Sequence, residues 1–299
     1  MLKKGAFGLS VLGLLVLLTI MILSEANNLP GGSSISGIIV GLLLPYIGKC
    51  IQDIADTTNW KKSQRKLMRA GDINKDTLIR VSFAYLFRIK IGNEYFLVKN
   101  ERGTGKYQPV GGVYQLSRSE KTDLKNLYKV KDDDKIPIDE SSKADYRLRI
   151  ENKYLRQFVR RFDKKAKRER ISDLSREFKE ETIDKGIIRW DTIKYRYCGR
   201  HMTTIHYSQH FQTYELLLAD IVELIPTKEQ ERDLKALQRN SSEIYRFATV
   251  KEIQALGIDT DKGRLDESIS DHTMKILQET EGELIASSDT GSVYNVRLH

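Results

Sequence analysis

The stretch SREFKEET, residues 175–182, places three glutamates and an arginine within eight residues. Glu177, Glu180 and Glu181 are three and four residues apart, so in a helix they share one face. Like charges on one face repel each other. Ion pairs with basic neighbours such as Arg176 would make this an ordinary solvated helix face, whereas a divalent cation would make it a functional site. Spacing alone leaves both interpretations open.

A glycine pair upstream favours the functional interpretation. Residues 107–115 read YQPVGGVYQ, and the adjacent glycines predict a tight loop whose backbone can approach a ligand closely. Hard cations such as Mg²⁺ prefer oxygen ligands and are often held by a few carboxylates together with substrate phosphates. A helix carrying Glu177, Glu180 and Glu181 opposite this loop could therefore bind a metal–diphosphate unit. Either Glu177 or Glu180 could then act as the base towards an attacking water.

The charge balance of the whole chain favours anionic partners. The 299 residues include 50 Lys and Arg against 41 Asp and Glu, for a formal net charge of +9. Charge of that sign attracts phosphates, nucleic acid or lipid headgroups. Two cysteines, Cys50 and Cys198, are too few for a disulfide framework or a zinc cluster, and they fit a reducing compartment.

Two apolar segments near the N-terminus predict a transmembrane hairpin. Residues 5–23, GAFGLSVLGLLVLLTIMIL, are long enough to span a bilayer core, and residues 35–52 form a second, shorter span. Basic residues precede the first span and follow the second, whereas the loop between the spans has none. The positive-inside rule therefore predicts a multi-pass membrane protein with both termini in the cytoplasm.

The first apolar segment has an alternative interpretation. A lysine pair, an apolar run and the residues SEA at 24–26 are also typical of a secretory signal peptide. Cleavage there would leave the second span holding the chain. We expect a hairpin region of residues 1–55, a basic juxtamembrane linker of residues 56–75 and a domain of residues 76–299 that lies in the cytoplasm in either case.

Beyond the linker, the pattern of apolar residues predicts strands mixed with helices. Residues 78–91 and 95–99 alternate apolar and polar side chains around the turn sequence IGNE, which predicts a β-hairpin. Residues 155–166 place apolar side chains at helical spacing beside a basic face that is either solvated or meets phosphates or anionic lipid. A final amphipathic helix is expected over residues 271–279. Strands and helices show no regular βαβ repeat, so the expected class is α+β with a mixed sheet.

The segment REFKEE, residues 176–181, resembles the core of the Nudix box. In that pattern Gly, five residues, Glu and seven residues precede Arg-Glu-hydrophobic-any-Glu-Glu-any-Gly. The glycine loop, the strand YELLLADIVEL and the closing segments resemble other Nudix elements in the same order, across residues 78–278. The resemblance implies an α/β/α Nudix-like sandwich. It also implies metal ligands at Glu177, Glu180 and Glu181, and structural roles for Arg176 and Phe178.

Several departures from the Nudix pattern accompany the match. The glycine loop and REFKEE are much further apart than in the family, so residues 115–170 are expected to be an insertion. The earlier Glu of the box falls on Arg168, with Glu169 as the nearest acid, and the closing Gly is replaced by Ile183. These departures make a Nudix fold a stronger expectation than Nudix hydrolysis.

Two membrane spans followed by a Nudix-like domain with a split box are similar to the membrane Nudix effectors of bacterial CBASS antiphage systems. The resemblance implies that the domain senses a cyclic oligonucleotide made by a cGAS/DncV-like nucleotidyltransferase. The spans would then disrupt the inner membrane and cause abortive infection. A homo-oligomer in contact with membrane lipid is implied, without a nucleic acid polymer as partner.

The ligand of such a sensor sets the choice of candidate residues. Phosphodiesters and stackable bases suit basic and aromatic side chains. We therefore select as candidate ligand-binding residues Arg88, Arg102, Tyr107, Gly111, Gly112, His206 and Tyr207.

Two further functions remain open from the sequence. The retained REFKEE segment would suit a membrane-anchored, Mg²⁺-dependent hydrolase of nucleoside diphosphate derivatives, with Glu177 and Glu180 as catalytic residues. A membrane scaffold that binds partners and no nucleotide is the other alternative. The damaged box and the paired spans favour the non-hydrolytic sensor.

Overall fold

The fold is described from a computed structural model, in which Thr19 and residues 60–298 can be described, apart from 101–102, 136–142, 165, 241, 260–262, 264 and 278–283. The chain divides into two compact units, residues 1–62 and 63–299. Apart from Thr19, the two predicted spans lie outside the described residues. Within the described part of the chain, no helix combines the length and the apolar character needed to cross a membrane.

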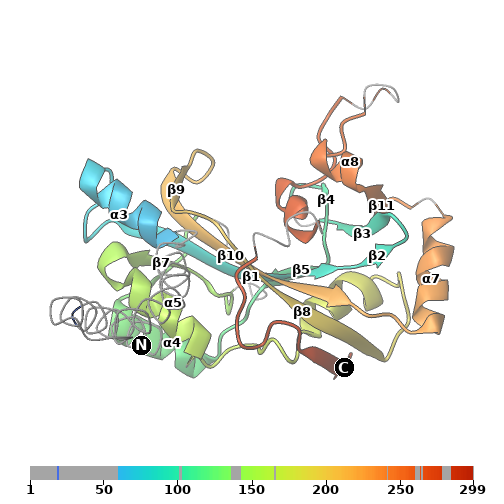
Figure 1. Cartoon of the computed structure of the whole chain (residues 1–299), viewed down its shortest axis with the longest axis horizontal. Coiled ribbons are helices and arrows are strands. Elements are labelled where there is room, and N and C mark those ends of the chain that lie inside the picture. Colours follow the sequence, from blue (N-terminus) through green and yellow to red (C-terminus); the bar gives the residue numbers. More distant parts are fainter. Residues whose placement is uncertain are drawn as a thin grey trace, which may run out of the picture. The chain divides into compact units, whose positions relative to one another are not determined.

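The larger unit is built on a mixed sheet of eight strands, called sheet A here (Figure 1). Its main path runs β12–β8–β10–β1–β7–β6, while β5 pairs with β1 and β9 pairs with β10. The long central strands β1 and β10 are parallel, and the other strand pairs described in this sheet are antiparallel. The strands of sheet A are β1 (Leu78–Arg88), β5 (Gly111–Val113), β6 (Lys131–Asp132), β7 (Arg147–Glu151), β8 (Thr192–Met202), β9 (His206–Ser208), β10 (Thr213–Leu224) and β12 (Val293–Arg297).

The two faces of sheet A have different cores because side chains alternate along each strand. On one face, Phe83 packs edge-on against Phe162, and Phe87 packs edge-on against Phe178, with ring centroids 4.5 and 5.1 Å apart. On the other face, Leu86 joins a largely aliphatic cluster shared with a second sheet. Both faces of β1 are therefore buried over most of its length, as its run of apolar residues requires.

The second sheet, sheet B, has the order β11–β3–β2, with β4 paired to β3. Its strands are β2 (Lys90–Ile91), β3 (Glu94–Lys99), β4 (Tyr107–Gln108) and β11 (Tyr245–Thr249). The predicted hairpin is confirmed only at its turn, where β2 pairs with β3 around Gly92. Residues 78–88 instead form β1 of sheet A, because the chain leaves one sheet near Ile89 and enters the other.

The predicted insertion contributes to the main sheet and its core. It forms α4 (Arg118–Tyr128), β6, β7, a 3₁₀ turn η1 (Asn152–Tyr154) and α5 (Leu155–Lys164). Strand β7 pairs with the first half of β1. The predicted apolar stripe on α5 is confirmed, since Leu155, Phe158, Val159 and Phe162 are buried. In Figure 1, α4 and α5 lie below the strands at left, whereas sheet B lies above them at right.

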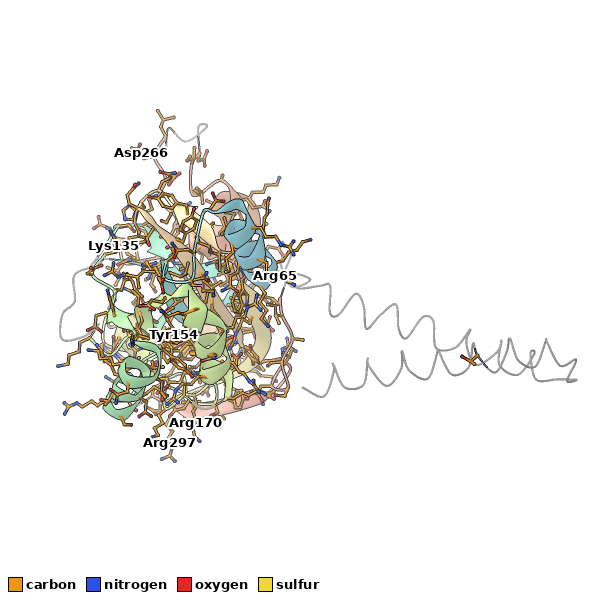
Figure 2. All side chains as sticks on the ribbon, turned by 90° about the vertical axis from the view of Figure 1, so that its left-hand side faces the viewer. Arg65, Lys135, Tyr154, Arg170, Asp266 and Arg297 are labelled. Carbon is orange, nitrogen blue, oxygen red and sulfur yellow. The ribbon has the colours of Figure 1, made fainter. Side chains whose placement is uncertain are left out.

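Helix α3 (Trp60–Ala70) occupies part of the predicted juxtamembrane linker. The Gln64 amide donates to Asn152 Oδ1 at 2.6 Å and accepts from Arg156 Nε at 2.7 Å. The Ser63 hydroxyl accepts from the backbone N–H of Ile205 at 2.8 Å. Gln64 and Asn152 are only 4% and 2% exposed, so these hydrogen bonds are shielded from water. The basic side chains of α3, such as Arg65, are exposed (Figure 2).

The remaining helices border sheet B and the C-terminal region. They are α7 (Lys228–Gln238), α8 (Val250–Gln254) and a 3₁₀ helix η3 (Asp271–Ile276). Thr227 and Gln230 form a capping box at the start of α7, as Thr249 and Glu252 do for α8. The expected amphipathic helix over residues 271–279 is wrong in type, because η3 is a 3₁₀ helix and Leu277 has extended backbone angles.

Candidate functional site

The REFKEE segment begins as one α-helical turn and continues with wider turns. Helix α6 (Arg176–Phe178) leads into a π-helix, η2 (Lys179–Ile183), in which Asp184 N–H bonds to the Lys179 carbonyl at 2.9 Å. Phe178 is fully buried, which supports its predicted structural role. Short π-helical insertions often occur at functional sites. The segment ends where Gly186 takes a positive φ of 68° and donates to the Ile183 carbonyl.

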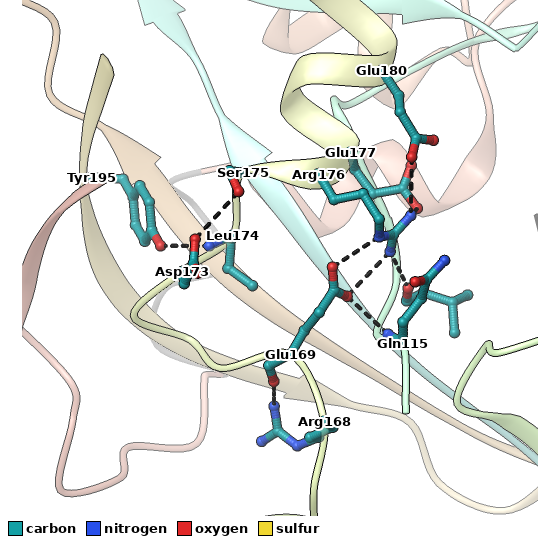
Figure 3. A network of polar contacts seen from close by, with 11 residues as sticks. Gln115, Arg168, Glu169, Asp173, Leu174, Ser175, Arg176, Glu177, Glu180 and Tyr195 are labelled. Atoms are coloured by element: carbon teal, nitrogen blue, oxygen red, sulfur yellow. Dashed lines mark hydrogen bonds and ion pairs between the residues drawn. The ribbon is translucent and has the colours of Figure 1, made fainter. Parts of the chain in front are cut away.

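Arg176 connects the helix to the segment before it (Figure 3). Its guanidinium contacts both carboxylate oxygens of Glu169, at 2.8 and 3.1 Å, and Glu177 Oε1 at 2.6 Å. It also donates to the Val113 carbonyl at 2.9 Å. Glu169 in turn accepts from the backbone N–H of Gln115 at 2.8 Å. Linear spacing places the earlier glutamate of the box on Arg168, but in space the acid that meets Arg176 is Glu169.

The glycine loop lies directly against two of the glutamates. Glu181 accepts from the Gly111 backbone N–H at 2.8 Å and from the Gln108 amide at 3.3 Å. A Cβ added to Gly112 would lie 2.1 Å from Glu177 Oε1, so the absence of a side chain makes room for that carboxylate. The predicted proximity of the glycine loop and the glutamates is confirmed.

Burial gives these carboxyl groups unusual acidity. It raises the pKa of Glu181 to about 8, against the opposing hydrogen bond from Gly111. Burial also raises the pKa of Glu177, although the Arg176 charge opposes this shift. The carboxylates add to each other's effect, since Glu177 raises the pKa of Glu181 and Glu180 raises that of Glu177. We call Glu169, Glu177, Glu180 and Glu181 the glutamate cluster.

Divalent metal binding by this cluster is supported by its chemistry but not by its present geometry. Closely spaced carboxylates that resist ionisation suit a hard cation such as Mg²⁺. Among the described residues, however, no three His, Cys, Asp or Glu side chains converge closely enough to hold a metal ion. To bind one, Glu177 and Glu181 would have to turn from Arg176 and Gly111. The assignment of Glu177, Glu180 and Glu181 as ligands stays a prediction.

Two of the predicted ligand-binding residues, His206 and Tyr207, lie far from the glycine loop. They are on β9, which pairs with β10 at Glu215, and Glu215 faces Arg80 of β1. Gly112 pairs with Tyr85, five residues further along β1, so the separation is roughly 16 Å at strand spacing. β9 therefore does not contribute to the same site.

The β9 residues belong instead to a separate network of ion pairs. His206 Nε2 lies 3.2 Å from Glu215 Oε1, and this hydrogen bond raises the pKa of His206. Arg80 bridges Glu215 and Asp133 at 3.0 and 2.8 Å, with its guanidinium buried.

The remaining ligand-binding predictions have different outcomes. Arg88 is fully buried and donates to the Ile276 carbonyl at 2.6 Å, so it holds η3 in place and is no ligand-facing group in this structure. Tyr107 is half-buried, and its hydroxyl donates to the Glu243 carbonyl. It stands one residue before Gln108, which contacts Glu181. Arg102 lies outside the described residues.

One acid near the cluster was not predicted from the sequence. Asp145 lies two residues before β7 and pairs through its backbone with Gln115. Burial raises the pKa of Asp145 to about 7, opposed by the charge of Arg147, and Glu177 and Glu169 add to the rise. No local motif marks Asp145, because its position depends on how the insertion returns to sheet A. Gln108 could have been found, since it stands three residues before the glycine pair.

The family follows from the whole arrangement. The model of the SMODS-associated NUDIX domain matches residues 78–277, from the first residue of β1 to the residue after η3. The chain belongs to this family. No curated protein matches it significantly. The expected Nudix-like domain of the CBASS-associated type is therefore confirmed, and the mixed α+β sheet fold agrees with it. The family association also supports a role in antiphage defence beside a SMODS nucleotidyltransferase.

Proposed function

We propose that the domain is the sensor of a membrane effector in a CBASS-type antiphage system. It would bind a cyclic oligonucleotide made by the associated nucleotidyltransferase. The membrane spans predicted for residues 5–23 and 35–52 would then disrupt the bacterial inner membrane, with both termini in the cytoplasm. The single observation that carries this proposal is the family match over residues 78–277.

The contacts of the glutamate cluster favour sensing over hydrolysis. Glu177 is paired with Arg176, and Glu181 is held by the Gly111 N–H and the Gln108 amide. A hydrolase of the Nudix type would need these carboxylates for metal and water. In their present positions they stabilise the loop and helix around them. Bound ligand can act as a signal if it favours one state of the protein over another, such as a clustered hairpin over a dispersed one.

The proposal is tested by expression in bacteria together with an active cyclic-nucleotide synthase. We expect membrane depolarisation with the full chain, and none when residues 1–59 are deleted, although the deleted form still binds the nucleotide. A catalytically dead synthase is the control for toxicity of the chain alone. Equal toxicity of the deleted form would show that membrane disruption is not the output.

A Mg²⁺-dependent hydrolase is the second candidate, favoured by the close approach of Glu177 and Glu181 to the glycine loop. The same cells distinguish the two functions through Glu177→Gln. A sensor should leave the nucleotide intact in chromatography with either wild type or the variant, and the variant should still depolarise the cells. A hydrolase should consume the nucleotide as wild type, and the variant should lose this turnover. A scaffold without a nucleotide ligand would show no thermal shift with any cyclic di- or trinucleotide.

A further inference from the structure

A cavity of about 360 Å³ lies beside the box, outside the glutamate cluster. Its base is formed by Asp220 of β10 and Arg200 of β8, and its rim by the end of α5, by Arg168 and by residues 285–289. This volume is at the lower end of the ~300–1,000 Å³ range of small-molecule pockets. It would take one nucleotide unit of a larger ligand.

The base of the cavity is held by a dense set of hydrogen bonds. Asp220 accepts from Tyr114 and Tyr197 at 2.7 and 2.9 Å, and its two oxygens also accept from Arg200 at 2.7 and 3.1 Å. Arg200 contacts Asp163 as well, at 2.5 Å. Because these buried groups satisfy one another, the base does not need to change when a ligand binds.

The rim carries two cations, Lys164 and Arg168, together with the carboxylates of Asp163 and Asp289. Neither Lys164 nor Arg168 forms an ion pair with any residue that the structure describes. The Arg168 guanidinium lies over the rings of Phe162 and Tyr114, 3.7 and 4.5 Å from their centroids, and donates to the carbonyls of Phe162 and Glu169. A stacked guanidinium presents its remaining N–H groups in a fixed plane, which suits phosphate oxygens.

Arg168 also connects the cavity to the box. It is adjacent to Glu169, whose carboxylate holds Arg176, and Figure 3 shows the two side chains extending in different directions from the same segment. Residue 168 is where linear spacing places the earlier glutamate of the Nudix pattern. The replacement of that acid by arginine removes a carboxylate from the box and supplies a cation to the cavity.

We infer that this cavity binds one phosphodiester-linked nucleotide unit of an anionic ligand, with its phosphate held by Lys164 and Arg168. The inference rests on the proposed function, because it assigns the sensor's ligand to a site separate from the glutamate cluster. Ser287 and Ser288 on the opposite rim supply hydroxyl groups for the rest of the nucleotide. Binding there displaces or stiffens the segment that carries Glu169, and so alters the box.

The test uses the full chain in detergent, titrated with a panel of cyclic di- and trinucleotides, linear dinucleotides and inorganic phosphate. Lys164→Glu should weaken binding of the best panel member at least tenfold, because it reverses a charge at the phosphate. Lys251→Glu is the matched control, since Lys251 is also exposed but lies on α8 and does not line the cavity. It should leave the Kd within twofold of wild type.

A second variant reports on the site without depending on charge. Ser288→Cys places a thiol at the exposed rim, and bound nucleotide should slow its reaction with a maleimide several-fold. If wild type binds a nucleotide but Lys164→Glu binds equally well and the thiol is not protected, this inference fails while the proposed function stands. If no nucleotide of the panel binds wild type, both fail.

Discussion

Two neighbouring regions on one face of sheet A differ in how their charged side chains are paired. In the glutamate cluster three of the four carboxylates pair with one guanidinium, that of Arg176, whereas the rim of the cavity has two cations without an ion-pair partner among the described residues. Consecutive residues mark the boundary, because Arg168 belongs to the cavity and Glu169 to the cluster.

The two regions suit different kinds of ligand. A cluster of several carboxylates suits a metal, and a pocket with unpaired cations suits a phosphate. In a metal-dependent phosphohydrolase both must act on the same ligand. Here the carboxylates are held by protein groups, while the cations remain available. The two regions can therefore be altered separately by mutation.

The largest expected effect comes from the glycine pair that borders the cluster. Gly111 has φ +144°, and an added Cβ would lie 2.2 Å from the Tyr85 backbone oxygen, so Gly111→Ala should destabilise by on the order of 3 kcal/mol. In Gly112→Ala the Cβ would instead meet the Glu177 side chain, which can move, at a cost of about 1 kcal/mol. Urea unfolding of both variants measures the difference. Equal losses of unfolding free energy in the two variants would mean that the Glu177 side chain is as rigid as the backbone.

Arg176→Ala should have the next largest effect. It leaves Glu169 and Glu177 without their cation in a half-buried setting, and the expected loss is about 2–3 kcal/mol. Arg232→Ala is the control, because that residue is 75% exposed and its ion pair should contribute less than ~0.5 kcal/mol. A stability of Arg176→Ala close to that of wild type would mean that the cluster tolerates its negative charge unaided.

The pH dependence of stability isolates the carboxyl groups of the cluster. Glu181 has a folded-state pKa of about 8, above its unfolded value, so unfolding releases its proton at neutral pH. Its contribution is fully present below the unfolded pKa and is lost as pH rises towards 8. We expect stability to fall between pH 5 and pH 8, and Glu181→Gln to reduce that fall. An unchanged slope in the variant would assign the effect to another group, such as Asp145.

Magnesium gives a companion measurement on the same proteins. If the cluster binds Mg²⁺, the ion must compete with the protons held at Glu181 and Glu177. Stabilisation by added Mg²⁺ should then be larger at pH 8 than at pH 5.5, and Glu181→Gln should reduce it. No stabilisation at either pH would argue against a metal role for these glutamates.

The smallest effect is expected at the edge of the cavity. Asp163 is 41% exposed and pairs with Arg200, so Asp163→Asn should change stability by less than ~1 kcal/mol. Removal of this negative charge should make nucleotide binding about twofold to fivefold tighter at low salt, with the gain lost at high salt. Weaker binding would mean that Arg200 needs Asp163 to hold its position.

Local patterns in the sequence predicted the elements that carry their own signals. The strand β10, the apolar stripe of α5 and the contact of the glycine loop with the glutamates all follow from periodicity, turn residues or the box motif. The path of residues 78–91 could not be predicted in this way, because the alternation of apolar and polar residues along one strand does not reveal where the chain passes from one sheet to another. The 3₁₀ geometry of η3 depends on Arg88, a partner nearly two hundred residues away in sequence.

The candidate site was predictable in part for similar reasons. Arg176, Glu177 and Glu181 were found because the motif is contiguous. Glu169 was identified only as the acid nearest to the expected position, which is residue 168. Whether residue 168 or residue 169 meets Arg176 depends on the backbone pairing of residues 115–116 with 168–169, which the sequence does not reveal. Arg88, His206 and Tyr207 were selected by side-chain type alone, and type does not determine which face or end of a sheet a residue occupies.

The hydrogen bonds of Gln64 bear on where the chain can be cut for work on the isolated domain. The family match begins at residue 78, which suggests a soluble piece starting shortly before it. Such a piece would lack Ser63 and Gln64, so the Ile205 backbone N–H and Asn152 Oδ1 would lose these hydrogen bonds and the surface beneath α3 would be exposed. Expression of a piece that starts at residue 60 should therefore give a more soluble protein than one that starts at residue 72.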